Sequence, residues 1–202
     1  MIADDYPPLQ RLVSATLTDH GIDVVALASD GEEALAVITA HRPQVAIVDL
    51  AMPGLRGVDV ASRAARVAPD TGVILYTGYA PRSSLVDAVA AGALGFVSKA
   101  APTHELVRAV EFVAHGEGYV DPSLASALVQ AAVDGGVAGL SGLERDILRL
   151  LSEGRSDAAV GTAVNISADV VQTYVARAMT QLGVHRQTRA VSAAIRMALG
   201  AR

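Results

Sequence analysis

The sequence predicts an α/β domain, built on a five-stranded doubly wound parallel sheet, followed by an all-α domain of four helices. Short apolar runs alternate with amphipathic helical segments over the first 115 residues, whereas only helical periodicity follows position 140. The two parts also differ in net charge, which is −8 up to Gly139 and +3 from Leu140 onward. An acidic part joined to a basic part indicates different partners, and the basic part is the candidate for nucleic-acid binding.

The composition excludes several classes of protein. Hydrophobic residues make up 51% of the chain, enough for the cores of two small domains. Cysteine is absent, which excludes disulfides and thiol catalysis. No apolar stretch is long enough to span a bilayer and no basic leader precedes one, so we expect a cytoplasmic protein without a membrane segment. Aromatic residues are only 3%, which disfavours a stacking platform for single-stranded nucleic acid.

The predicted strands of the first part are apolar on consecutive residues, a pattern typical of strands that helices cover on both faces. A first strand at 1–3 is followed by strands at 24–28, 45–49, 73–77 and 95–99. The first strand is shorter than usual, so either the true start lies upstream or this strand is stunted. Helices are predicted near 7–20, 31–42, 58–68, 83–93 and 103–115.

Polar side chains stand where these strands end. Asp4 and Asp5 follow the first strand, and Asp49, Thr77 and Lys99 close later ones. The carboxyl ends of parallel strands meet at one edge of the sheet, where such folds place their sites. Grouped carboxylates repel one another, and a hard divalent cation such as Mg²⁺ relieves that repulsion. The single lysine of the chain offers a compact charge that arginine cannot replace.

This series, with Met-Pro-Gly shortly after Asp49 and with Phe96 three residues before Lys99, resembles the receiver domain of two-component response regulators. The resemblance implies a CheY-like sheet of strand order 2-1-3-4-5. It also implies that Asp49 is the phosphoacceptor, which would take a phosphoryl group from a sensor histidine kinase. Such a domain catalyses transfer to its own aspartate and is not a dedicated enzyme.

The resemblance further implies the metal ligands and the switch residues. Mg²⁺ would be bound by Asp5, Asp49 and the backbone carbonyl of Ala51, with Asp4 holding the waters of the ion. Lys99 would pair with a phosphoryl oxygen, and Thr77 and Phe96 would form the switch that answers phosphorylation. A dedicated enzyme that carries phosphoryl groups on Asp49 is disfavoured, because Ala51 stands where a second acid would be needed.

Residues 117–139 are predicted to be a linker between domains at 1–116 and 140–202. The linker contains a helical stretch from Pro122 to Val133 and then the sequence DGGVAG, a glycine-rich joint suited to a flexible boundary.

The last part has the pattern of a helix-turn-helix. Helices are predicted at 143–154, at 157–164 after a Ser156 cap, at 168–182 after a Ser167 cap, and through Leu199. From Leu140 to about Gly200 the segment resembles the DNA-binding domain of the NarL/FixJ, or LuxR, type. The resemblance implies a transcription factor that binds promoter DNA as a homodimer, with a recognition helix in the major groove.

Departures from that family weaken the predicted DNA contacts. Gln172 and Gln181 stand where lysines are usual, and Asp169 is acidic, so we expect weak DNA binding. The candidate contacts that remain are Gln172, Thr173, Arg177 and Ser167. The alternative is a phospho-regulated adaptor whose helix-turn-helix domain contacts protein.

Gly161 lies inside a predicted helix where an alanine is usual. A glycine costs about 1 kcal/mol relative to alanine in a helix interior, so it suggests a loosely held DNA-binding unit.

Overall fold

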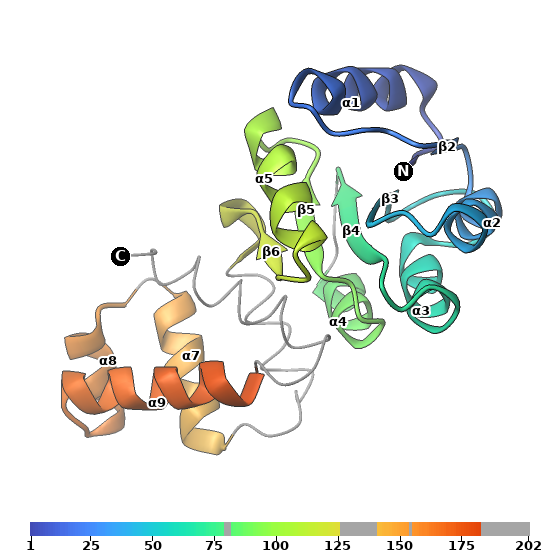
Figure 1. Ribbon diagram of the computed structural model, residues 1–202. Helices are drawn as coiled ribbons and strands as arrows, with labels where there is room; N and C mark the ends of the chain where they lie inside the picture. Colours follow the sequence, from blue (N-terminus) through green and yellow to red (C-terminus); the bar gives the residue numbers. More distant parts are fainter. Residues whose placement is uncertain (79–81, 126–140, 154, 183–202) are drawn as a thin grey trace.

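The computed structural model describes residues 1–78, 82–125, 141–153 and 155–182. Residues 1–125 form an α/β unit, and residues 141–182 form a helical unit (Figure 1). The α/β unit contains a parallel sheet of order β2-β1-β3-β4-β5-β6. The predicted order is therefore confirmed for five strands, and the expected strand count is wrong by one.

The elements of the α/β unit alternate as the sequence predicts. They are β1 (Ile2–Ala3), α1 (Pro7–Asp19), β2 (Leu27–Ala28), α2 (Gly31–His41), β3 (Val45–Asp49), α3 (Gly57–Val67), β4 (Gly72–Thr77), α4 (Arg82–Ala90), β5 (Gly95–Ser98), α5 (Thr103–Ala114) and β6 (Tyr119–Val120).

Helices cover both faces of this sheet (Figure 1). The apolar residues of α1 and α5 pack against one face, with Val13, Leu106 and Val110 buried there. The apolar residues of α2, α3 and α4 pack against the other face. The buried side chains there form what we call the α2–α4 cluster, which includes Ile38, Val60, Leu85 and Phe96. Two-sided burial explains why β3 and β4 are apolar along their length.

Strand β2 is shorter than predicted. The apolar run at 24–28 predicts five strand residues, but only Leu27 and Ala28 pair with β1. The reason is that β1 offers only Ile2 and Ala3 as partners, so Val25 has no strand beside it and is 57% exposed. Beside it, at the amino ends of the strands, lies a cavity of about 670 Å³.

Strand β6 lies within the predicted linker. Tyr119 and Val120 pair in parallel with Gly95 and Phe96 of β5, at the edge of the sheet. The Tyr119 hydroxyl donates to Glu105 of α5, and burial together with that hydrogen bond raises the pKa of Tyr119. Two apolar residues after a glycine-rich turn carry too little pattern to predict a strand.

The helical unit consists of α7 (Gly142–Ser152), α8 (Asp157–Val164) and α9 (Ala168–Leu182) within the described residues. Ser141 and Glu144 form a capping box at the start of α7, and the Ser156 side chain caps α8. A small apolar core joins the three helices, and its buried members are Ile147, Leu151, Val160, Val171 and Val175.

Gly161 has a packing role that the sequence does not predict. A Cβ atom built there would lie 2.5 Å from the carbonyl oxygen of Ile166, in the turn between α8 and α9. That turn is tight because the Ile166 amide donates back to the Gly161 carbonyl and Asn165 adopts a left-handed conformation. The absent side chain therefore lets the turn close.

Two predicted helices fall wholly or partly outside the described residues. The final helix, expected through Leu199, lies outside them entirely. Of the linker helix expected from Pro122 to Val133, residues 122–125 are described and are helical. Within the described part of the chain, no helix combines the length and apolar character needed to cross a bilayer.

Candidate functional site

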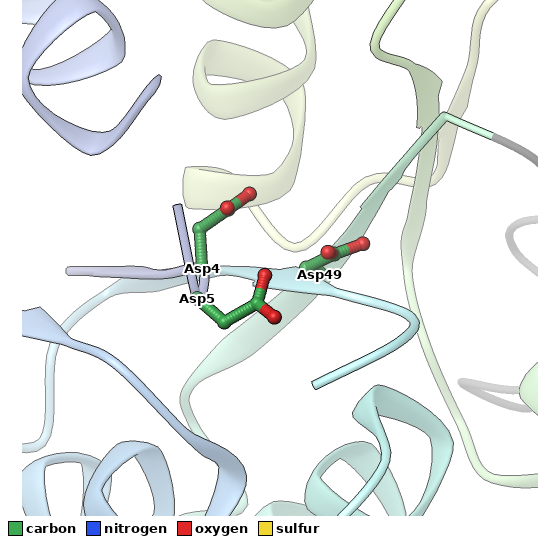
Figure 2. A group of neighbouring side chains, drawn as sticks. All are labelled: Asp4, Asp5 and Asp49. Atoms are coloured by element: carbon green, nitrogen blue, oxygen red, sulfur yellow. The ribbon is translucent and has the colours of Figure 1, made fainter. Parts of the chain in front are cut away.

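Three carboxylates meet at the carboxyl edge of the sheet. Asp4 and Asp5 follow β1, and Asp49 ends the neighbouring strand β3, so strand pairing brings them together. One oxygen from each lies within 4.8 Å of the others. Figure 2 shows the three side chains grouped at this edge of the sheet. Asp4 and Asp49 are buried, whereas Asp5 is exposed. The predicted acidic cluster is thus assembled with one side open to solvent.

Lys99 joins this cluster from the end of β5. Its Nζ lies 2.7 Å from Oδ2 of Asp4 and 2.9 Å from Oδ2 of Asp49. Burial opposes the charge of the ammonium, but the hydrogen bonds to Asp4 and Asp49 outweigh it, and the pKa of Lys99 is raised. The lysine therefore remains charged and bridges the two buried acids.

The charges of the site leave a place for a divalent cation. Three carboxylates and one ammonium carry a net charge of −2, because Lys99 balances only one of the acids. Carboxylate oxygens are hard donors of the kind that Mg²⁺ prefers. Ala51, whose carbonyl the resemblance assigns to the ion, lies in the exposed loop two residues beyond Asp49. The residues present fit such a metal.

Two residues that the sequence reasoning missed position the acids. Gln10 of α1 is buried, and its Nε2 donates to the carbonyls of Asp4 and Ala28 at 2.7 and 2.6 Å, which fixes the end of β1. At Gly57, a Cβ would lie 2.3 Å from the carbonyl oxygen of Asp49. The absence of a side chain there allows α3 to begin directly against the end of β3.

Of the two predicted switch residues, Thr77 lies beside this site, and Phe96 lies on β5 three residues before Lys99. Thr77 ends β4 and is 5% exposed, and its carbonyl accepts from the Lys99 amide at 2.7 Å. Phe96 is 1% exposed and belongs to the α2–α4 cluster together with Leu85 and Ala88 of α4.

The predicted DNA contacts lie on or beside α9. Gln172 and Thr173 are exposed, but each makes a hydrogen bond within the helical unit. Nε2 of Gln172 donates to Oδ2 of Asp157 in α8 at 2.5 Å, and Oγ1 of Thr173 donates to the Asp169 carbonyl. The base-reading amide predicted by the sequence is therefore already held by an acid.

The other two predicted contacts are only partly described. Ser167 precedes α9, and its Oγ accepts from the amide of Val170 at 3.4 Å, which agrees with the predicted cap. Arg177 lies on α9, but its side chain is outside the described residues.

Two protein-family models match this sequence. The response regulator receiver domain matches residues 1–111, and the luxR family of bacterial regulatory proteins matches residues 138–194. The first match contains the acidic cluster, and the second contains all three described helices of the helical unit.

Curated relatives resemble the chain over nearly its whole length. The DNA-binding transcriptional activator DevR/DosR of Mycobacterium tuberculosis is 33% identical over 195 residues, covering 94% of this chain and 90% of the relative. The probable transcriptional regulatory protein NarL of the same organism is 34% identical over 205 residues, covering 98% and 94%. Among solved structures, the response regulator ChrA of a heme-sensing two-component system is 32% identical, with a TM-score of 0.55 and coverage of 98% of this chain and 96% of ChrA.

Proposed function

The chain belongs to the two-component response regulators with a LuxR-type regulatory domain, and we propose that phosphorylation of Asp49 controls its binding to promoter DNA. The observation that carries the proposal is the bridge from Lys99 to Asp4 and Asp49. It places a charged lysine on the carboxylate that would accept the phosphoryl group. The partners are a sensor histidine kinase, promoter DNA and a second copy of the chain, and we infer that the protein acts in the cytoplasm.

The chemistry at Asp49 is a phosphoryl transfer. A carboxylate oxygen of Asp49 attacks the phosphorus of a phosphohistidine, the P–N bond breaks, and the imidazole nitrogen takes the electron pair and a proton. The product is an acyl phosphate on Asp49. Asp5, Asp49 and the Ala51 carbonyl would hold Mg²⁺, with Asp4 on its waters, and the bound ion supplies charge neutralisation for the phosphoryl oxygens.

The remaining site residues change their contacts when Asp49 carries a phosphoryl group. Lys99 keeps its contact with Asp4 and exchanges the Asp49 carboxylate for a phosphoryl oxygen, because its Nζ already contacts the carboxylate that would carry the phosphoryl group. The Thr77 hydroxyl, on the neighbouring strand end, donates to another phosphoryl oxygen, and Phe96 shifts with it. The phosphate adds nearly two negative charges to a half-buried site, which is enough to bias a switch between two arrangements.

The helical unit supplies the output. In the recognition helix α9, Gln172, Thr173 and Arg177 contact base edges and phosphates, and Ser167 stands at its start. The pair of Gln172 and Asp157 opposes DNA binding, since the acid both occupies the amide and repels phosphates. We therefore propose modest intrinsic affinity that phosphorylation raises through dimerisation. The adaptor alternative has no support among the named relatives, which are transcriptional regulators.

The test is phosphorylation of the full chain with acetyl phosphate and Mg²⁺, read by intact mass and by binding to DNA selected from random sequence. We expect the wild type to gain one phosphate and to bind DNA more tightly, with affinity falling as salt rises. Asp49→Asn should gain none. Asp59→Asn is the matched control, because Asp59 is an exposed acid of the same unit that pairs with Arg56 on the surface.

Two results would contradict the proposal. Equal phosphate uptake by wild type and Asp49→Asn would exclude Asp49 as the acceptor. Phosphate on the wild type without DNA binding at any salt concentration would favour the adaptor.

A further inference from the structure

The chain does not leave the α/β unit after α5 but returns to the sheet as β6. The Tyr119 amide donates to the Leu94 carbonyl at 3.0 Å, and the Asp121 amide donates to the Phe96 carbonyl at 2.9 Å. The segment that leads to the helical unit therefore begins as a strand bound to β5. That strand carries Phe96 and ends next to Lys99, so any shift of its end is passed to the segment beside it.

Asp121, directly after β6, holds the end of β5 with its side chain. It is 1% exposed, and its Oδ2 accepts from the Ser98 amide at 2.5 Å. Its Oδ1 accepts from the amide and the hydroxyl of Ser123 at 2.8 and 2.5 Å. Within the described residues no cation pairs with Asp121, so these hydrogen bonds are what compensate its burial. Ser98 is the residue before Lys99, which bridges Asp4 and Asp49.

The helical turn that follows Asp121 extends toward the helical unit. Asp121 caps the helical turn at 122–125, where Leu124 is partly buried and Ala125 is 1% exposed. Ala125 belongs to the α2–α4 cluster, which also contains Phe96, and Leu124 packs against that cluster. Leu148, on α7 of the helical unit, is 2% exposed and is a member of the same cluster. The turn that follows Asp121 and the first helix of the helical unit therefore meet the same apolar cluster.

We propose that Asp121 is a clasp that couples the position of Lys99 to the placement of α7, and so regulates the DNA binding proposed above, on which this inference rests. When Lys99 leaves Asp49 for a phosphoryl oxygen, the amide of Ser98 moves with the end of β5. The clasp transmits that movement because one Asp121 oxygen holds Ser98 and the other holds the start of the 122–125 turn. Leu148 then repacks in the α2–α4 cluster. The coupling depends on this contiguous network with two arrangements, and a substitution within it tests the dependence directly.

Asp121→Asn breaks the clasp with little change of shape. An asparagine amide has one acceptor oxygen, which can serve Ser123, and its NH₂ group then faces the Ser98 amide and cannot accept from it. Asparagine caps a helix as well as aspartate does, so the turn at 122–125 is retained. The matched control is Asp30→Asn, the same substitution at the cap of α2, where the Asp30 side chain accepts from Glu33. Leu148→Ala is a second variant, which removes most of the α7 side chain that packs in the α2–α4 cluster.

The experiment measures phosphate uptake, DNA affinity with and without phosphate, and hydrogen exchange of 119–125 and 141–153, all in the full chain. In wild type and Asp30→Asn, phosphorylation should change DNA affinity by the same factor and alter exchange in both segments. In Asp121→Asn and Leu148→Ala, phosphate uptake should be normal. The factor by which phosphorylation changes DNA affinity should be about tenfold smaller than in wild type, or should equal one. Without phosphate, Asp121→Asn should also exchange faster at 119–125.

Each contrary outcome is distinct. Normal phosphate uptake with an unchanged affinity factor in Asp121→Asn would overturn the clasp and leave the proposed function intact. Loss of phosphate uptake in Asp121→Asn would also overturn it, because Asp121 would then act on the phosphorylation site and not on the output. A wild type that takes up no phosphate would overturn the proposed function, and the clasp with it.

Discussion

The acidic site of the α/β unit and the recognition helix of the helical unit are held in opposite ways. Asp4 and Asp49 are buried and are bridged by Lys99, so the site is assembled before any ligand arrives. Gln172 and Thr173, the proposed DNA contacts, are exposed, and each makes a hydrogen bond within the helical unit itself. The acidic site is therefore assembled in advance, whereas the side chains proposed to contact DNA are held by other residues of the helical unit.

The largest expected effect comes from removing the cation that holds the acidic site together. Lys99→Met leaves Asp4 and Asp49 buried beside each other without their partner, and breaking such a pair costs about 3 kcal/mol. We expect the free energy of unfolding, measured by urea denaturation without metal, to fall by about that amount. Mg²⁺ should restore part of it, because the ion binds the folded site and not the unfolded chain.

Arg56→Met is the matched control for that substitution. The side chains of Arg56 and Asp59 pair at 3.2 Å but are 65% and 42% exposed. An exposed pair of this kind contributes about 0–1 kcal/mol. If the two variants lost similar stability, the acidic site would be no more preorganised than the surface.

A smaller effect is expected at the turn that positions the recognition helix. Gly161→Ala would gain about 1 kcal/mol of helix propensity, but its Cβ would meet the backbone of Ile166 at 2.5 Å, and such overpacking costs about 1–3 kcal/mol. We therefore expect a net loss of stability, with faster hydrogen exchange in 155–182. Gly142→Ala, at the start of α7, is the control, because among the described residues no atom of another segment lies within 4 Å of its added Cβ. A more stable Gly161→Ala would mean that the turn relaxes freely.

The sequence predicts the site residues that stand at strand ends, but not those that hydrogen-bond to distant backbone groups. The partners Asp49, Thr77 and Lys99 are predictable because each ends an apolar strand, and parallel pairing alone brings strand ends together. Gln10 and Asp121 are not, because their partners are backbone groups that only the tertiary fold brings near.

The strand lengths follow the same rule. The predicted length of β2 is too great because its apolar run extends beyond the two residues that β1 can pair. Strand β6 is not predicted because its pairing with β5, and not its local sequence pattern, makes it a strand. The engagement of Gln172 by Asp157 is likewise invisible in a helical repeat, since the two residues lie on different helices.

The smallest expected effect is at the surface proposed to bind DNA. Asp157→Ala removes the acceptor that holds Gln172, and it removes one negative charge beside the proposed DNA contact. A hydrogen bond of this kind contributes about 1 kcal/mol, so we expect DNA affinity, measured by fluorescence anisotropy, to rise about fivefold. Asp146→Ala controls for charge alone, because Asp146 is an exposed acid of α7 that pairs with Arg149. Equal gains in the two variants would reduce the effect to net charge, and the recognition helix would then not be restrained by its own acid. A gain confined to Asp157→Ala would mean that the helical unit limits its own affinity for DNA. Phosphorylation at the acidic site would then raise an affinity that is low from the start.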